Sequence, residues 1–269
     1  MSGDNTTQWL VVRLDEQSYA LQADSIQEMV QIAEVRQLPL GVEFLRGLIT
    51  IRDKAMPLFD LRTRLGLSSL DESIEKLIEL FDAREQDHIN WLIELEQSVK
   101  ERRPFKLTTD PHKCAFGRWY DNFKSENLIV QAQLGKFDQP HKSIHAIAEQ
   151  VAEMEERGEF DEALALIETT RNQELALMIT LFEQTRRVIR ETRRELAVLV
   201  YFNSSIIALA VDGVHSVEQL KASDGGELSF TVNDMVQGFG KSNMEDMVML
   251  LDHTRLLSRD QMQSLEVLP

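Results

Sequence analysis

The hydrophobic periodicity of the chain changes twice, and these changes constrain its fold more than any other feature. From Trp9 to about Leu67, short apolar runs such as WLVVRL and GLITIR are separated by turn residues, which is typical of small barrels. From about Asp71 to Glu195, apolar residues recur every three or four positions, which predicts amphipathic helices. From Leu196, strand-like runs such as LAVLVYF return. The flanks therefore resemble two halves of one β domain that encloses a helical insertion.

The helical middle contains three stretches with a helical period. The first runs from Ile74 to Val99 and is followed by a break at Pro104. Because proline suits the first turn of a helix, we expect another helix to begin near Pro140. Gly158 then separates this helix from a long third one, whose apolar residues lie close to one face.

The composition excludes several classes of partner. The chain has 269 residues, 43% of them hydrophobic, and a formal net charge of −16, which repels nucleic acid and anionic membrane surfaces. No apolar run approaches the roughly 20 residues of a membrane span, and the first residues do not resemble a secretory signal. The single cysteine precludes an internal disulfide, which fits a reducing cytoplasm. We therefore expect a cytoplasmic protein without direct membrane insertion.

Three of the six histidines combine with the only cysteine into a candidate metal site. His88 lies on the apolar stripe of the first helix, and Cys114 follows the break at Pro111. His141 and His145 are four positions apart, so both imidazoles lie on one helix face, about 6 Å apart. Neighbouring helices of a bundle can supply the other two ligands. One thiolate with three imidazoles favours zinc over magnesium or calcium.

The spacing alone leaves alternatives open. His88 could be a satisfied core histidine, and Cys114 a buried and inert thiol. His112 also competes as a ligand, because it lies only two residues before the cysteine.

In the first turn of its helix, His141 would be kept neutral by the positive end of the helix dipole and so able to bind a metal.

A full set of four protein ligands argues against catalysis. No position of a tetrahedral ion would remain for an activated water. Lys142 also occupies the place that a glutamate takes in H-E-x-x-H metalloproteases. We therefore predict that the chain is not an enzyme, and we keep a zinc enzyme only as a distant alternative.

Three fragments resemble the chemoreceptor zinc-binding (CZB) family. They are HINW at 88–91, CAFGRW at 114–119 and HKSIH at 141–145, in the order and at the spacing of that family. The resemblance implies a four-helix bundle that holds one Zn²⁺ per chain through His88, Cys114, His141 and His145. It also implies a role in sensing zinc or oxidants. His112 matches no ligand position of the family.

The flanks resemble the chemotaxis coupling protein family CheW. The similar stretches are RGLITIRDKAMPLFDLRTRLGL (46–67), IQEM (26–29), VDGV (211–214), GFG (238–240) and MLLD (249–252). That family folds as two small, SH3-like β-barrels that bridge chemoreceptor tips and the histidine kinase CheA. The resemblance implies that Ile26 and Glu28 face the kinase and that Arg62 faces the receptor. The alternative for Glu28 and Arg62 is solvated surface charge, and Thr50 and Asp53 depart from the family pattern.

These observations predict an α+β multidomain chain. We expect residues 1–68 and 197–269 to form the paired β-barrels and residues 69–196 to form the inserted four-helix bundle. The predicted function is a signal-transduction adaptor at chemoreceptor arrays, with Cys114 as the redox-responsive ligand. The main alternative is an adaptor whose zinc is purely structural.

Overall fold

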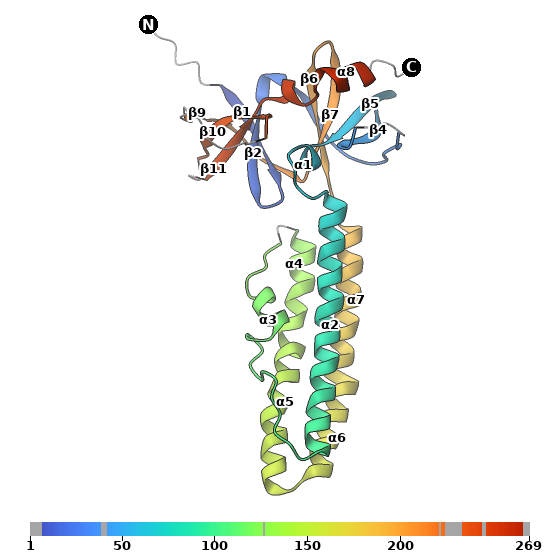
Figure 1. Cartoon of the computed structure of the whole chain (residues 1–269), viewed down its shortest axis with the longest axis vertical. Helices are drawn as coiled ribbons and strands as arrows, with labels where there is room; N and C mark the ends of the chain where they lie inside the picture. The colour runs from blue at the N-terminus through green and yellow to red at the C-terminus, as the bar shows by residue number, and fades with distance from the viewer. Residues whose placement is uncertain are drawn as a thin grey trace. The chain divides into compact units, whose positions relative to one another are not determined.

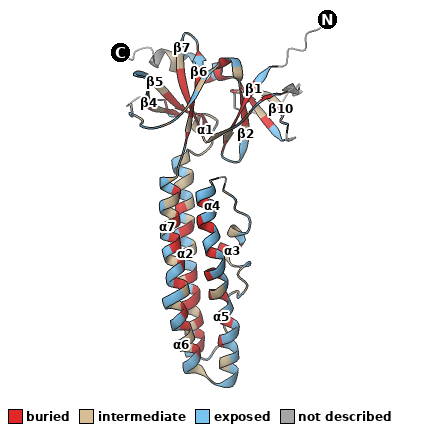
Figure 2. Cartoon of the chain, turned by 180° about the vertical axis from the view of Figure 1, so that it is seen from behind, coloured by how far each residue is buried: buried red, intermediate tan, exposed pale blue. Residues whose placement is uncertain are grey.

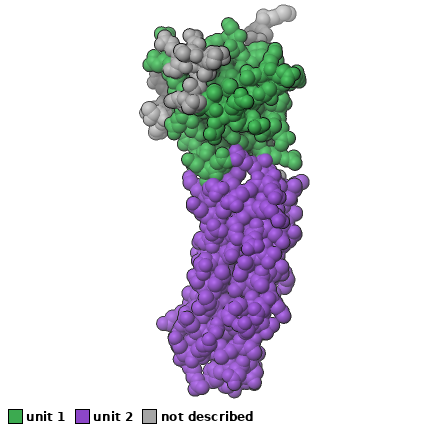
Figure 3. Space-filling view, turned by 90° about the vertical axis from the view of Figure 1, so that its right-hand side faces the viewer, with its two compact units in different colours: residues 1–72, 194–269 green, residues 73–193 purple. Residues whose placement is uncertain are grey.

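The computed structural model describes residues 7–38, 42–125, 127–220, 222–223, 233–243 and 246–265. The chain divides into two compact units, one of residues 1–72 and 194–269 and one of residues 73–193 (Figure 3). The first boundary therefore follows residue 72, where residue 68 was predicted, and the second follows residue 193, where residue 196 was predicted.

The first unit is built from β-strands that come from both ends of the chain (Figure 1). The N-terminal flank contributes β1 (Gln8–Leu14), β2 (Gln17–Gln22), β3 (Ile26–Gln31), β4 (Leu45–Ile51) and β5 (Lys54–Asp60), followed by the short helix α1 (Leu61–Arg64). The C-terminal flank contributes β6 (Leu196–Phe202), β7 (Ser205–Val211), β8 (Gly213–Gln219), β9 (Ala222–Ser223), β10 (Val236–Lys241), β11 (Met247–Leu251) and helix α8 (Arg259–Leu265).

The strands form two sheets, and each sheet needs both flanks. The six-stranded sheet has the order β8-β1-β2-β11-β10-β9, and the five-stranded sheet has the order β3-β6-β7-β5-β4. In the latter, β6 pairs antiparallel with β3, and β7 pairs parallel with β5. Without β6 and β7, β3 would have no neighbour in its sheet. The two flanks must therefore fold together, whatever is inserted between them.

Burial explains why the sequences of the central strands are continuous runs of apolar residues. In β6, Ala197 to Val200 are all buried, as are Ile207 to Val211 in β7 (Figure 2). A strand covered on both faces has no position for a polar side chain. The predicted α+β class is confirmed. The two predicted barrels are present as two sheets. In the five-stranded sheet, the chain that follows β3 closes onto the other edge strand, β4, through an antiparallel bridge between Arg36 and Leu48.

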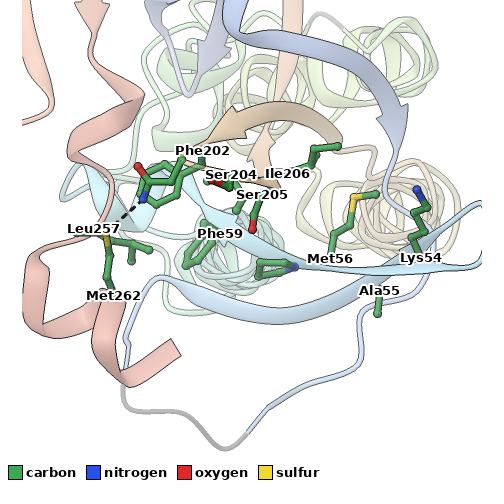
Figure 4. Close-up of a pocket in the computed structure, with 13 residues that line it drawn as sticks. Lys54, Ala55, Met56, Phe59, Phe202, Ser204, Ser205, Ile206, Leu257 and Met262 are labelled. Carbon is green, nitrogen blue, oxygen red and sulfur yellow. Dashed lines mark hydrogen bonds between the residues drawn. The ribbon is translucent and has the colours of Figure 1, made fainter. Parts of the chain in front are cut away.

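A cavity of about 660 Å³ opens in the first unit beside the β6–β7 turn (Figure 4). Its floor is apolar and includes Met56, Phe59 and Ile207, while Lys54 and Ser205 contribute polar groups. At the end near α8, the Asn203 side-chain amide donates to the Met262 sulfur at 3.6 Å. The cavity is therefore an apolar recess with a polar border.

The second unit contains three long helical rods. The first is α2 (Leu70–Lys100), on which the predicted stripe from Phe81 to Val99 is buried. The second consists of α4 (Leu128–Leu134), a 3₁₀ turn η2 (Gly135–Phe137) and α5 (Asp138–Arg157). The third consists of α6 (Phe160–Thr170), a π-helical turn η3 (Arg171–Leu175) and α7 (Ala176–Glu191). Gly158 ends α5 in the left-handed conformation, with a φ of 78°, which favours glycine.

Two features of this unit differ from the prediction. The fourth helix, α3, covers only Ala115–Tyr120 and follows an irregular segment that contains Pro104 and Pro111, so the described residues only partly form a four-helix bundle. In addition, Leu134 and Phe137 both have helical backbone angles, so no free helix end lies at Pro140. The dipole argument for a neutral His141 was therefore wrong.

Arg62 occupies a buried position in the first unit. Its side chain pairs with Asp212 at 3.0 Å and with Asp15 at 3.3 Å, and Nε donates to the carbonyl oxygen of Ser68 at 2.9 Å. Only 3% of the residue is exposed. Both earlier interpretations, a receptor-facing side chain and a solvated charge, are contradicted by this burial. The guanidinium instead joins α1 to the β1–β2 and β7–β8 turns.

We expect Arg62→Met to destabilise the first unit by about 3 kcal/mol, because the Asp212 carboxylate would stay buried without its closest cation. Arg52→Met is the matched control, since the Arg52 side chain is 79% exposed and its ion pair should contribute less than about 1 kcal/mol. Urea denaturation of both variants measures the difference. Equal losses in the two variants would contradict the role assigned to Arg62.

Candidate metal centre

His88 is held by the buried face of α2. The residue is 4% exposed and lies on the same stripe as Phe81, Leu92 and Leu95. Its Nδ1 donates to the carbonyl oxygen of Arg84, one turn earlier, at 2.7 Å. This bond fixes the ring tautomer and leaves Nε2 as the atom with a free lone pair. Nε2 is buried and has no hydrogen-bond partner among the described residues.

Cys114 precedes the short helix α3 as its N-cap. The backbone N–H of Gly117 donates to Sγ at 3.1 Å, which orients the sulfur. A Cβ at position 117 would lie 1.8 Å from the carbonyl oxygen of Pro111, so only glycine fits there. The sulfur lies 3.2 Å from Nε2 of His141. The local chain therefore directs the thiol towards α5.

His141 and His145 lie one turn apart on α5 and are 4% and 2% exposed. The ring of Trp91 packs against His145, with ring centroids 4.9 Å apart. Trp91 Nε1 donates to the carbonyl oxygen of Thr108 at 2.8 Å, which ties α2 to the irregular segment. Neither ring nitrogen of His145 has a hydrogen-bond partner among the described residues, although the Thr108 backbone is near enough to favour the protonated ring.

The structure brings all four candidate ligands together. One donor atom from each of His88, Cys114, His141 and His145 lies within 4.8 Å of the others. His112 is not in this group: its side chain is 60% exposed, and its Nδ1 pairs with Asp121 at 2.9 Å. The spacing left open whether His112 belongs to the cluster, and the geometry places Cys114 inside it and His112 outside it.

Burial sets the protonation states of the cluster. Burial, together with the neighbouring His88, lowers the pKa of His141 to about 3 and that of His145 to about 4. Burial also lowers the pKa of His88 and raises that of the Cys114 thiol. In the metal-free protein, the three imidazoles are therefore neutral at pH 7. Neutral imidazoles have the lone pairs that a metal ion needs.

The donor set fits a single tetrahedral cation. Three buried ring nitrogens of His88 and His145 have no partner among the described residues, and each such nitrogen costs about 1–3 kcal/mol. One sulfur and three imidazoles are soft or borderline donors, as zinc and similar transition metals prefer. This cluster of described residues is therefore compatible with one metal ion.

The residues predicted to face partners lie in the first unit, on β3. Ile26 is half-buried against the core, and the Glu28 side chain is 23% exposed. Glu28 accepts a hydrogen bond from Arg52 at 2.7 Å. Arg52 lies in the β4–β5 turn, where Arg52 and Asp53 both have positive φ. The sequence prediction did not include Arg52 among the residues that face partners. The departure from the family pattern at Asp53 lies in the same turn as Arg52.

Comparison with known families agrees with both halves of this description. Residues 8–86 match the family model of the CheW-like domain, and residues 88–152 match that of the chemoreceptor zinc-binding domain. The chain thus combines a CheW-like domain with a CZB domain. The CZB match includes all four clustered residues. Strands β6 to β11 lie outside both matched ranges and complete the sheets that β1 to β5 begin.

The chain is also similar to a crystal structure of the scaffolding protein TtCheW from Thermoanaerobacter tengcongensis, with 13% sequence identity, a TM-score of 0.43 and 95% of each chain covered. A comparison with curated protein sequences finds no match. Among the described residues, no helix combines the length and the apolar character that crossing a membrane requires.

The lowered histidine pKa values predict an acid-sensitive metal-free protein. A histidine has a pKa near 6.5 in the unfolded chain, whereas the pKa values of His141 and His145 in the folded protein are near 3 to 4. The stabilisation that these two neutral histidines provide is therefore complete above pH 6.5 and is lost as the pH falls towards 4. Each should reduce the unfolding free energy of the second unit by up to about 1.4 kcal/mol per pH unit.

Urea denaturation of the metal-free protein between pH 7 and 5 measures this slope, because most carboxylates titrate below that range. His145→Gln should reduce the slope, whereas His112→Gln should not, since His112 is exposed. A stability that does not change between pH 7 and 5 would contradict the burial of neutral histidines.

Proposed function

We propose that this chain is a chemotaxis adaptor that couples chemoreceptors to the histidine kinase CheA, and that its inserted helical unit senses zinc or oxidants through Cys114. The two family matches support the adaptor and the zinc-binding unit. The observation that carries the sensing role is the cluster of four donor atoms within 4.8 Å, of which only one is a sulfur. We place the protein in the cytoplasm, at receptor arrays.

Zinc is the cation that best suits the cluster. When bound, it would hold Cys114 as a thiolate at neutral pH, which is the nucleophilic and oxidisable form. His88 would ligate through Nε2, since its Nδ1 donates to Arg84. The imidazoles resist mild oxidants, so the sulfur would be the only ligand of the four that responds to them.

Both junctions of the insertion are held by buried polar groups of the first unit. At the exit, the Ser68 carbonyl oxygen accepts from Arg62 at 2.9 Å. At the return, the Glu195 carboxylate pairs with Arg46 at 2.7 Å, and its carbonyl oxygen accepts from Ile32 N–H at 3.1 Å. A change in the helical unit would pull on these residues first. This gives a physical route for coupling, which the experiments below test.

The docking surface that we propose includes Ile26, Glu28 and Arg52. The Glu28–Arg52 pair joins β3 to the β4–β5 turn, and the Arg52 side chain is 79% exposed. An ion pair with an exposed arginine is typical of the polar rim of a protein interface. We do not include Arg62, because its guanidinium is buried.

A structural role for zinc remains the main alternative. In that case the ion would only satisfy the buried nitrogens and hold the rods together, without any effect on the docking surface. A zinc enzyme is disfavoured, because four protein donors leave no position for an activated water.

The first test is metal content. Protein purified without added metal should contain one zinc per chain by elemental analysis, and Cys114→Ala and His145→Ala should lose most of it. His112→Ala is the matched control and should keep its zinc, because this side chain lies outside the cluster. Full zinc content in the Cys114 and His145 variants would refute the site.

The second test concerns docking. Glu28→Arg should weaken CheA binding about tenfold through charge repulsion, as expected for an interfacial charge reversal. In the double variant that combines Glu28→Arg with Arg52→Glu, the ion pair can form again with its charges exchanged. CheA binding should then stay weak only if Glu28 itself contacts the kinase. Binding assays with CheA and receptor tips measure both effects. If the unmodified protein binds neither partner, the adaptor proposal fails.

The third test separates a sensor from a structural zinc. Equimolar hypochlorous acid should convert the thiolate to a sulfenic acid with release of chloride, eject zinc, and be reversed by excess thiol. Oxidation should change partner affinity by about 1–3 kcal/mol, the usual size of an allosteric coupling. Cys114→Ser should not respond. Zinc release with unchanged partner affinities would favour the structural role.

A further inference from the structure

A cavity of about 480 Å³ leads from solvent to the candidate metal centre, within the helical unit. Its lining includes three of the four clustered residues, His88, Cys114 and His145, but not His141. His88 Nε2 and both ring nitrogens of His145 are buried and lack partners among the described residues. The cavity therefore ends on groups that are available to a ligand.

The incomplete bundle explains why this cavity exists. A fourth long rod beside α2 would cover the donor atoms, but that place is taken by the irregular residues 101–114 and the six-residue helix α3. Leu107 and Thr108 of the irregular segment line the cavity together with Asn90 and Trp91 of α2. The sulfur of Cys114, at the start of the short helix, is therefore one of the candidate ligands that an incoming molecule meets in this cavity.

The charges at the cavity are not balanced. Lys113 pairs with Asp110 at 3.1 Å, and Asp87 pairs with Arg84 at 3.3 Å. Arg118 also lines the cavity, but its Nη1 donates to the neutral carbonyl oxygen of Lys113 at 2.9 Å, and no carboxylate of the described residues forms an ion pair with it. The exposed Arg118 guanidinium is therefore the cationic group of the cavity lining that no described carboxylate balances.

We propose that this cavity admits small anionic, thiol-reactive molecules to the Cys114 sulfur, and that Arg118 is the residue that selects for the anion. The inference rests on the proposed sensing role and names the class of reagent to which that site responds. Arg118 acts by raising the local concentration of anions beside the sulfur. Arg118 and Cys114 both line the cavity, so an anion attracted by the guanidinium enters the same space as the sulfur.

Iodoacetate and iodoacetamide test the selection, because they have similar size and chemistry but differ in charge. In both reactions the thiolate sulfur forms a bond to the methylene carbon, the carbon–iodine bond breaks and iodide leaves. Cys114 is the only cysteine, so mass spectrometry reports its alkylation without ambiguity. The rates can be measured with and without zinc, so a failure of zinc binding would leave this test intact.

In Arg118→Gln, the ratio of the iodoacetate rate to the iodoacetamide rate should fall about fivefold, the effect of one unit charge near the sulfur in a water-like medium. Arg118→Lys should keep the ratio, and 1 M salt should abolish the difference between variants. Arg187→Gln is the control, because Arg187 is also exposed, lies on α7 and does not line the cavity. An unchanged ratio in Arg118→Gln, or the same fall in Arg187→Gln, would overturn the role of Arg118.

The route itself is tested by narrowing the cavity. Asn90→Trp places a large side chain at its wall and should slow both reagents, whereas Gln86→Trp, one turn earlier on the same helix, should not. Equal rates in these two variants would overturn the cavity as the path to the sulfur.

Discussion

The helical unit depends on burying three neutral imidazoles in one apolar core. His88, His141 and His145 lie among Trp91, Phe116 and the other large side chains of that core, and each is at most 4% exposed. An apolar core normally excludes groups that lack hydrogen-bond partners. A cation that accepts one lone pair from each ring would remove most of this energetic penalty, so the packing of the rods is coupled to the binding of a metal.

The four ligands are not held equally. The histidines lie on long rods, whose apolar stripes fix them, whereas Cys114 caps a helix of six residues behind an irregular segment. The backbone N–H of Gly117 donates to the Cys114 sulfur, and the ring of Phe116 is buried against Phe137 and Phe182. The only candidate ligand with redox chemistry therefore lies on the shortest α-helix described in the unit.

Much of this structure could be predicted from the sequence, because period and spacing are local properties. The apolar stripe of α2 and the histidine pair of α5 follow directly from positions along a helix. The predictions that failed depend on the tertiary fold. Arg62 looks like a surface charge in the sequence, because only the folded chain brings the β1–β2 and β7–β8 turns against its side chain. Spacing likewise could not choose between His112 and Cys114. Only the turn at α3 directs the Cys114 sulfur inward and the His112 ring towards Asp121. Pro140 predicted the start of its helix to within two residues, since α5 begins at Asp138, but the preceding residues also have helical backbone angles.

The central claim is that one ion is ligated by one sulfur and three imidazole nitrogens. X-ray absorption spectroscopy of the zinc-loaded protein measures this ligand set directly. The account predicts one sulfur at about 2.3 Å and three nitrogens at about 2.0–2.1 Å, the usual distances for tetrahedral zinc. The same measurement on Cys114→Ala should lose the sulfur shell. A spectrum of the unmodified protein with only nitrogen and oxygen neighbours would contradict the account.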